Sequence, residues 1–253
     1  MDEIIPFLKR ENADVVALTE VFDGHNSDWE ARYRSMDVLR EALGYPHEAF
    51  AQTFCEVEDF GEVNQGNAVL SKFPIQSQDI IALEPYAKRD ARVAHQQYFS
   101  ASGDEQAMAQ VFMNTPRNIQ HVQIDIRGNT LNLLNTQGPW GMDGLDDDRR
   151  LAMGRAIGER VSALKNVVVC GDFNVQENTQ SIALIEQQLK NVFKGELTTS
   201  FNMEQKKTHR FAAGFATSVV DMLFVSPDLS IVEKAVYPDN VSDHLSMSVT
   251  VNI

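Results

Sequence analysis

The chain has 253 residues, of which 43% are apolar and 23% charged, so it can form one large soluble domain over residues 1–253 but hardly two. No apolar run approaches the roughly 20 residues that a membrane-spanning helix needs, so we expect no transmembrane segment. The formal net charge of −14 disfavours binding to extended duplex nucleic acid, whose phosphates require a Lys/Arg surface. A site for a hard cation would use part of this acidity, although solubility alone explains most of it.

The beginning of the chain and the cysteines indicate a reduced protein without a secretory signal. In residues 1–14, charged side chains surround only a few apolar positions, unlike the charged and then apolar segments of a signal peptide. The two cysteines are too few for a disulfide framework, and Cys170 lies in an apolar run. We therefore expect a cytoplasmic monomer with Cys55 and Cys170 reduced.

The predicted elements alternate along the chain. Apolar segments with β character occupy residues 15–18, 68–70, 119–126, 131–134, 167–170, 219–225 and 245–251. Apolar residues at helical spacing predict helices over residues 29–43, 157–164 and 182–192, and residues 76–110 form a long excursion without assigned structure. Arg-Gly-Asn at 127–129 predicts a hairpin turn. Because the strands and helices follow no strict βαβ repeat, we expect an α/β fold of two packed mixed sheets covered by helices.

Polar residues close two of the predicted strands. Asp172 and Asn174 follow the buried run 167–170, two residues apart and therefore on the same side of an extended chain. Asp172 can take a proton from water while Asn174 positions that water or a phosphate oxygen, although an Asx turn would also explain the pair. Glu20 closes the run that begins at Val15, where a metal-binding carboxylate or simply a solvated glutamate would stand.

Two further carboxylates lie near the C-terminus. Asp221 stands within an apolar run, and an unpaired buried carboxylate is costly, so it needs a partner, for which His244 and an arginine are the candidates. Asp243 and His244 precede the last predicted strand and reach one site only if the backbone bends there. Asp243 can bind a metal and His244 can stabilise a phosphate or donate a proton; a turn aspartate beside a surface histidine is the structural alternative.

Six segments combine these residues in a specific order. They are Leu-Thr-Glu-Val (18–21), Gly-Asn-Ala-Val-Leu-Ser-Lys-Phe-Pro-Ile (66–75), Asn-Thr (135–136), Gly-Asp-Phe-Asn (171–174), Val-Asp (220–221) and Ser-Asp-His (242–244). Together they resemble the endonuclease/exonuclease/phosphatase superfamily over nearly the whole chain. The resemblance implies a four-layer α/β sandwich that cleaves phosphoester bonds with Mg²⁺ or Mn²⁺, as nucleases and phosphatases of this kind do.

The same resemblance implies a role for each candidate residue. Glu20 would be the main metal ligand and Asp243 a second one. Asp172 would activate or orient water and Asn174 would hold the phosphate. His244, paired to Asp221, would stabilise the developing charge, which fits the general logic of phosphoryl chemistry.

The sequence departs from the superfamily pattern at two places. Relatives usually begin with a strand that ends in an asparagine supporting the metal site, and here Met1 falls at or just before the helix that follows it. We therefore expect this first strand to be absent and an edge of the sheet to be exposed. Gln137 occupies the place where a histidine commonly contacts the scissile phosphate; it can donate a hydrogen bond but carries no charge.

The substrate and even catalysis stay open at this level. Residues 115–120, 135–140 and 171–182 look like a small bacterial branch of the superfamily with an unsettled substrate. Arg117 is a candidate substrate contact, with surface solvation as the structural alternative. We expect hydrolysis of a small or exposed phosphodiester or phosphomonoester. The alternative is a non-catalytic relative that binds a phosphorylated ligand or a partner in the same cleft, which Gln137 favours and the complete acidic set opposes.

Overall fold

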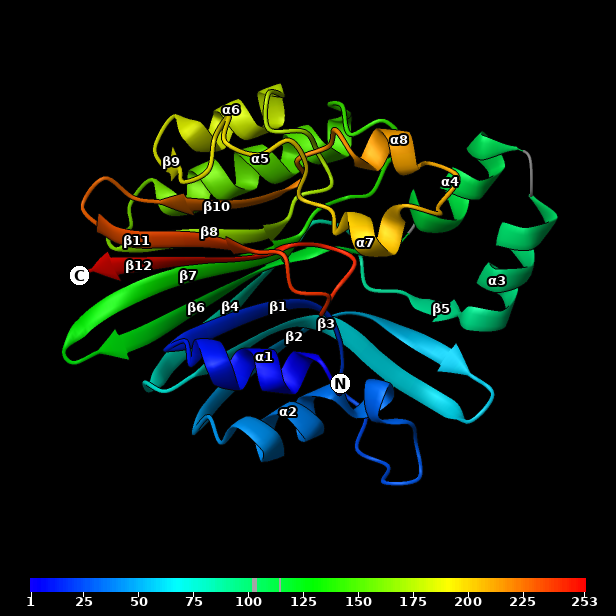
Figure 1. Cartoon of the computed structure of the whole chain (residues 1–253), viewed down its shortest axis with the longest axis horizontal. Coiled ribbons are helices and arrows are strands. Elements are labelled where there is room, and N and C mark those ends of the chain that lie inside the picture. The colour runs from blue at the N-terminus through cyan, green and yellow to red at the C-terminus, as the bar shows by residue number, and fades with distance from the viewer. Residues whose placement is uncertain (102–103, 114) are drawn as a thin grey trace.

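A computed structural model of the chain describes residues 1–101, 104–113 and 115–253, and its strands form two large mixed sheets and one separate pair (Figure 1). The first sheet has the order β1 (Val15–Phe22), β3 (Gly61–Ser71), β2 (His47–Glu58), β5 (Lys88–Asp90). The second has the order β4 (Ile75–Ala82), β6 (Asn118–Ile126), β7 (Asn129–Gln137), β8 (Val167–Asp172), β10 (Asp221–Val225), β9 (Lys190–Asn191). The pair is β11 (Ser230–Tyr237) and β12 (Ser246–Asn252).

Alternation along the strands assigns their side chains to three hydrophobic clusters. Val69 of β3 and Val168 of β8 point between the two large sheets and share one cluster. Their neighbours Leu70 and Val169 point the opposite way, each toward the helices that cover its own sheet. Each sheet is therefore buried on both faces, which explains why its central strands read as nearly continuous apolar runs.

The helices form the two outer layers. On the first sheet lie α1 (Ile4–Glu11) and α2 (Ser35–Leu43), preceded by the 3₁₀ turn η1 (Ala31–Arg34); on the second lie α5 (Asp148–Val161) and α6 (Gln180–Glu186). The expected four-layer α/β sandwich is thereby confirmed. The predicted helix over residues 29–43 is wrong in its first half, where only the 3₁₀ turn forms.

Two excursions carry the remaining helices. The segment 76–110, which shows no clear pattern in the sequence, contains most of β4, β5, α3 (Ala91–Ser100) and the beginning of α4 (Glu105–Met113), and its helices project at the right of Figure 1. Between β9 and β10 lie α7 (Met203–Lys206) and α8 (Ala212–Phe215). None of the helices in the described ranges is long and apolar enough to cross a membrane.

Local sequence chemistry fixes several element ends. The hairpin turn predicted at residues 127–129 is confirmed between β6 and β7: Ile126 pairs with Asn129, and Arg127 and Gly128 between them both have positive φ, 56° and 94°. Asp147 caps α5 by accepting a hydrogen bond from the backbone N–H of Arg150. Asp146 accepts from the backbone N–H groups of Gln180 and Ser181 and so caps α6 from a distant loop.

The first sheet ends in an open edge. Within the described residues no strand precedes α1, and β1 is the outermost strand, paired on one side with β3. The β11–β12 pair is hydrogen-bonded to neither large sheet. The strand that carries Glu20 is therefore an edge strand of the first sheet.

Candidate active site

Two carboxylates face each other where β8 ends and β10 begins. The antiparallel register places Asp172 directly opposite Asp221, so both side chains leave the sheet on the same face. Gly171 precedes Asp172 with φ of 142°, and a Cβ atom there would lie 1.8 Å from the carbonyl oxygen of Thr136. Only glycine lets β7 and β8 approach this closely at the edge of the site.

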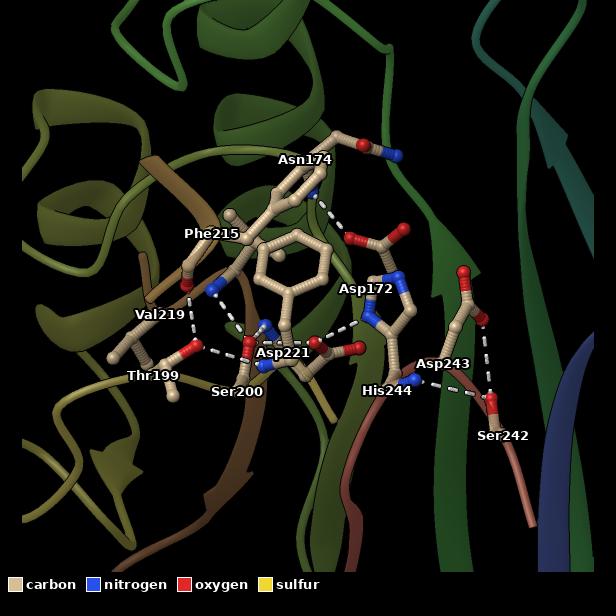
Figure 2. Close-up of polar contacts among 12 residues, drawn as sticks. Asp172, Asn174, Thr199, Ser200, Phe215, Val219, Asp221, Ser242, Asp243 and His244 are labelled. Atoms are coloured by element: carbon tan, nitrogen blue, oxygen red, sulfur yellow. Dashed lines mark hydrogen bonds and ion pairs between the residues drawn. The ribbon is translucent and has the colours of Figure 1, made fainter. Parts of the chain in front are cut away.

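Asp221 is paired with His244, as the sequence predicted. The Nδ1 atom of His244 lies 2.7 Å from Oδ2 of Asp221, and the same oxygen accepts a hydrogen bond of 2.6 Å from Oγ of Ser200 (Figure 2). Ser200 Oγ in turn accepts from the backbone N–H groups of Val220 and Asp221. The alternative of an arginine partner for Asp221 is wrong.

A bend before β12 directs His244 into the site. The residue forms an isolated bridge with Phe201, its ring lies 4.5 Å from the Phe201 ring, and Leu245 donates its backbone N–H to the carbonyl of Ser200. The segment 199–202 therefore holds the histidine on one side while Asp221 orients its ring on the other. This fixes which nitrogen points away from the Asp221 carboxylate and toward the site.

The pKa values of this group are strongly perturbed. Burial, followed by the nearby charge of Asp221, raises the pKa of Asp172 to about 7. Burial lowers the pKa of His244, but the charge and hydrogen bond of Asp221 outweigh this effect and raise it to about 10. At neutral pH the site therefore holds an imidazolium beside a carboxylate that is close to its own titration point.

Asn174 belongs to a tight turn that is clasped to the neighbouring loop. Its φ is 54°, its backbone N–H donates to Oδ1 of Asp172 at 2.9 Å, and its side-chain Nδ2 donates to the carbonyl of Gly138 at 3.0 Å. Gly138 donates its own N–H to the carbonyl of Asp172. The predicted Asx turn is thus real, and it presents Asn174 beside the site.

Glu20 reaches the second sheet because β1 is irregular at this point. The pairing of β1 with β3 shifts register between Leu18 and Val21, and Glu20 has a φ of 57°, a conformation that a glutamate rarely adopts. Its Oε1 accepts a hydrogen bond of 2.6 Å from Nε2 of Gln137, the last residue of β7. The bulge therefore aims an exposed carboxylate across to the strand ends that carry the other candidates.

Arg117 is buried in the site region, not solvated on the surface. Only 6% of the residue is exposed, and its Nε and Nη1 atoms have no hydrogen-bond partner among the described residues. Burial lowers its pKa, while the carboxylates of Glu20 and Asp172 counteract this effect by stabilising the cation. Arg117 immediately precedes β6, whose partner strand β7 ends at Gln137, so both lie at the same end of the sheet. The alternative of surface solvation is wrong.

Asp243 lies at the rim of the site. Its Oδ2 atom is 2.6 Å from Nζ of Lys206, the last residue of α7, and half of its side chain is exposed. Burial raises its pKa, but Lys206 and His244 outweigh this effect, so that the pKa lies below its usual value. Asp243 and His244 thus reach the same site from adjacent positions, as the bend before β12 allows.

The sequence of the whole chain decides its family. The model of the Endonuclease/Exonuclease/phosphatase family matches residues 1–244. The chain belongs to this family. No curated protein matches it in sequence.

Solved members of the endonuclease/exonuclease/phosphatase family share its fold at low identity. A family structure from Beutenbergia cavernae is 18% identical in sequence, with a TM-score of 0.68. The match covers 99% of this chain but only 65% of the Beutenbergia chain. A mannosyl-6-phosphatase from Bacteroides thetaiotaomicron is 18% identical, with a TM-score of 0.63, and the match covers 99% of this chain and 89% of the phosphatase. TDP2 of D. rerio, complexed with a single-strand DNA product, is 15% identical, with a TM-score of 0.62, and the match covers 99% of this chain and 90% of TDP2.

Members of this family generally depend on a divalent metal, and the described residues offer suitable donors. One ligand atom from each of Asp172, Asp221 and His244 lies within 4.8 Å of the others. Glu20 and Asp243, the ligands that the sequence predicted, lie outside this group and contact Gln137 and Lys206 instead. Carboxylate oxygens are the donors that Mg²⁺ and Mn²⁺ prefer, so the carboxylates at these strand ends suit such an ion, whereas His244 as an imidazolium does not bind one.

Sequence reasoning missed two residues of the site. Ser200 lies in an unpatterned stretch, and only the folded structure shows that its hydroxyl supports Asp221. Lys206 and Lys207 form a basic pair in a strongly acidic chain, which was a usable signal for a position near anionic groups. Nothing in their spacing tells which of the two lysines faces the site.

Proposed function

We propose that the chain is a divalent-metal-dependent hydrolase of phosphoester bonds that acts on a small or exposed phosphodiester or phosphomonoester. The observation that carries this proposal is the buried Arg117 guanidinium, which lies beside the charges of Glu20 and Asp172 and whose Nε and Nη1 atoms lack partners in the described part of the chain. A buried cation whose N–H donors are unpaired costs free energy unless an anion accepts hydrogen bonds from it. A planar guanidinium fits the oxygens of a phosphoryl group particularly well.

The remaining residues supply the other parts of a hydrolytic site. Asp172 has a pKa near neutrality, which suits a group that takes a proton from the attacking water. His244, held as an imidazolium by Asp221, can stabilise charge on a phosphoryl or leaving oxygen. Asn174, at the turn clasped to Gly138, is placed to hold a phosphate oxygen.

A divalent metal ion, when bound, would neutralise part of the negative charge at the site. Glu20 and Asp243 would hold Mg²⁺ or Mn²⁺, which acts as a Lewis acid on a phosphoryl oxygen when bound. Gln137 donates its amide hydrogen to Glu20 and so orients this carboxylate. It adds no positive charge, which leaves Arg117 and His244 as the cationic groups that face the phosphate.

The charge of the molecule restricts the substrate. A net charge of −14 repels a long polyanion, whereas a single phosphate group meets only the local cations of the site. The structural relatives include a mannosyl-6-phosphatase and a protein bound to a single-strand DNA product. Both are compatible with a substrate whose phosphate is exposed.

Hydrolysis of generic esters tests the proposal. We would measure release of p-nitrophenol from bis-p-nitrophenyl phosphate and p-nitrophenyl phosphate with Mg²⁺, Mn²⁺ or EDTA. The variants are Asp172→Asn and, as a control that also removes one negative charge, Asp59→Asn, whose side chain is 79% exposed. We expect metal-dependent release, reduced at least about 100-fold by Asp172→Asn and unchanged by Asp59→Asn.

The second candidate function is binding without catalysis, and the neutral Gln137 favours it. A non-catalytic protein would bind inorganic phosphate through Arg117 yet release no p-nitrophenol above the Asp172→Asn background. Calorimetric titration of phosphate alongside the assay separates the two functions. Release that persists fully in EDTA would contradict metal dependence.

A further inference from the structure

An ammonium group is built into the acidic site. Nζ of Lys206 lies 2.6 Å from Oδ2 of Asp243, and the Lys206 side chain is only 19% exposed. The same nitrogen lies 5.1 Å from the ring centroid of Phe215 and 5.9 Å from that of Phe201, within the range of cation–π attraction. Three contacts therefore hold this lysine against a carboxylate that the family resemblance assigns to the metal.

The backbone fixes this arrangement. Asn202 donates its backbone N–H to the carbonyl of Asp243 at 2.9 Å and its side-chain Nδ2 to the carbonyl of Ser242 at 3.0 Å. Its side-chain oxygen also caps α7 by accepting from the N–H of Glu204. Asn202 thus ties the start of α7 to the Asp243 segment, so the helix brings Lys206 to Asp243 as a defined neighbour.

The adjacent lysine has the same charge but a different position. Lys207, which directly follows α7, pairs with Glu204 of that helix at 3.0 Å, and its side chain is 62% exposed. A lysine that serves only solubility or helix stability would resemble Lys207. Lys206 instead forms its ion pair with Asp243, a carboxylate at the rim of the candidate active site.

We propose that Lys206 is an internal counter-ion that competes with the divalent metal for Asp243 and thereby sets the metal affinity of the site. The inference rests on the proposed function, in which Asp243 is a metal ligand. A metal ion needs the carboxylate oxygen that the ammonium contacts, and two cations at one oxygen repel each other. Metal binding therefore requires Lys206 to leave Asp243, which its flexible four-carbon stem permits.

Metal titration tests this inference without an activity readout. We would count free Mn²⁺ by electron paramagnetic resonance during titration of the wild type, Lys206→Met and Lys207→Met. Both variants change the net charge equally, so a difference between their Mn²⁺ affinities reports the effect of the position of the lysine. We expect Lys206→Met to bind Mn²⁺ about tenfold more tightly than the wild type and Lys207→Met to stay within about twofold. Equal affinities for the two variants would overturn the inference.

A double-mutant cycle with Asp243→Asn shows whether Lys206 acts through this carboxylate. In the Asp243→Asn background we expect Lys206→Met to have no effect on Mn²⁺ affinity. A tenfold effect that persists there would assign it to the general field of the site and overturn the competition. If Mn²⁺ binds but Lys206→Met binds no more tightly, this inference alone fails. If no protein binds Mn²⁺ and EDTA leaves ester hydrolysis unchanged, the metal-dependent function fails with it.

Discussion

Two arginines among the described residues are buried, and their surroundings differ. Arg150 is 1% exposed and donates to the carbonyls of Pro139 and Leu145 and to the carboxylate of Asp143. It therefore holds the loop between β7 and α5 together. Arg117 is 6% exposed, and two of its nitrogen atoms, Nε and Nη1, have no partner among the described residues, whereas in Arg150 this holds for Nη2 alone. One arginine is thus used for structure, while the other is left available.

This difference predicts opposite effects of the same substitution. Arg117→Met should lower kcat/KM for a phosphoester about 100-fold or more, because a preorganised phosphate donor is lost. Its free energy of unfolding should stay within about 1 kcal/mol of the wild type, since a costly unpaired charge leaves the interior. Arg150→Met should lower the free energy of unfolding by at least about 2 kcal/mol, because the buried carbonyls that Arg150 contacts lose their hydrogen-bond donor. Kinetics and urea denaturation of both variants check this; a loss of stability in Arg117→Met equal to that of Arg150→Met would contradict it.

At the scale of elements, the junction of β7 and β8 determines where Asp172 stands. Gly171 allows the close approach of these parallel strands, since a Cβ atom would lie 1.8 Å from the carbonyl oxygen of Thr136. Gly128, in the β6–β7 hairpin, also has positive φ, but a Cβ atom there would meet nothing within 4 Å. The two glycines share a backbone restriction and differ in available space.

Alanine substitutions separate these two effects. Gly128→Ala should cost about 1–2 kcal/mol, the penalty of the left-handed conformation alone. Gly171→Ala should cost at least about 3 kcal/mol, because the backbone must also move, and it should displace Asp172 and abolish ester hydrolysis. Denaturation midpoints and rates of hydrolysis measure both outcomes. Equal costs at the two positions would show that the β7–β8 contact is not limiting.

Elements with strong periodicity were predictable, and those shaped by tertiary packing were not. The apolar runs that became β6, β7 and β8 are buried on both faces, so their composition identifies them. The pairing of Asp221 with His244 followed from the cost of an unpaired buried carboxylate. In contrast, β4 exposes most of its residues and β11 half of them, and neither strand shows a clear alternation of burial. The bulge that aims Glu20 at Gln137 has no local sequence signal, because the partner lies 117 residues away.

At the scale of the whole molecule, buried titratable groups change the free energy of unfolding in opposite directions as the pH rises. The pKa of Asp172 is raised, so this group lowers stability as pH rises from about 4 to about 7. The pKa of His244 is also raised, and its contribution is lost as pH rises from about 6.5 to about 10. His121 behaves in the opposite way, because burial lowers its pKa. Its contribution is complete above about pH 6.5 and is lost below it, where the unfolded chain takes up the proton first.

The contacts of His121 explain why it stays neutral. Nε of Arg160 donates to its Nδ1 at 2.9 Å, and its Nε2 lies 3.0 Å from Oδ1 of Asn132. Arginine is only a donor, so Nδ1 must accept and the proton must sit on Nε2. A proton on Nδ1 would break the bond to Arg160 and place two cations together. This residue therefore ties β6 to the end of α5 only in its neutral form.

We expect the stability difference between the wild type and His121→Gln to shrink as the pH falls. At pH 7.5 the variant should be less stable, since glutamine replaces the paired imidazole imperfectly. At pH 5.5 the wild type has lost part of its advantage, by about 1.4 kcal/mol at most, because about 1.4 kcal/mol corresponds to each pH unit below 6.5. Asp172 and His244 are common to both proteins, so their opposing contributions cancel in the difference. Urea denaturation at the two pH values and constant ionic strength measures it, and a difference that does not change with pH would mean that His121 takes up its proton equally readily in the folded and unfolded chain.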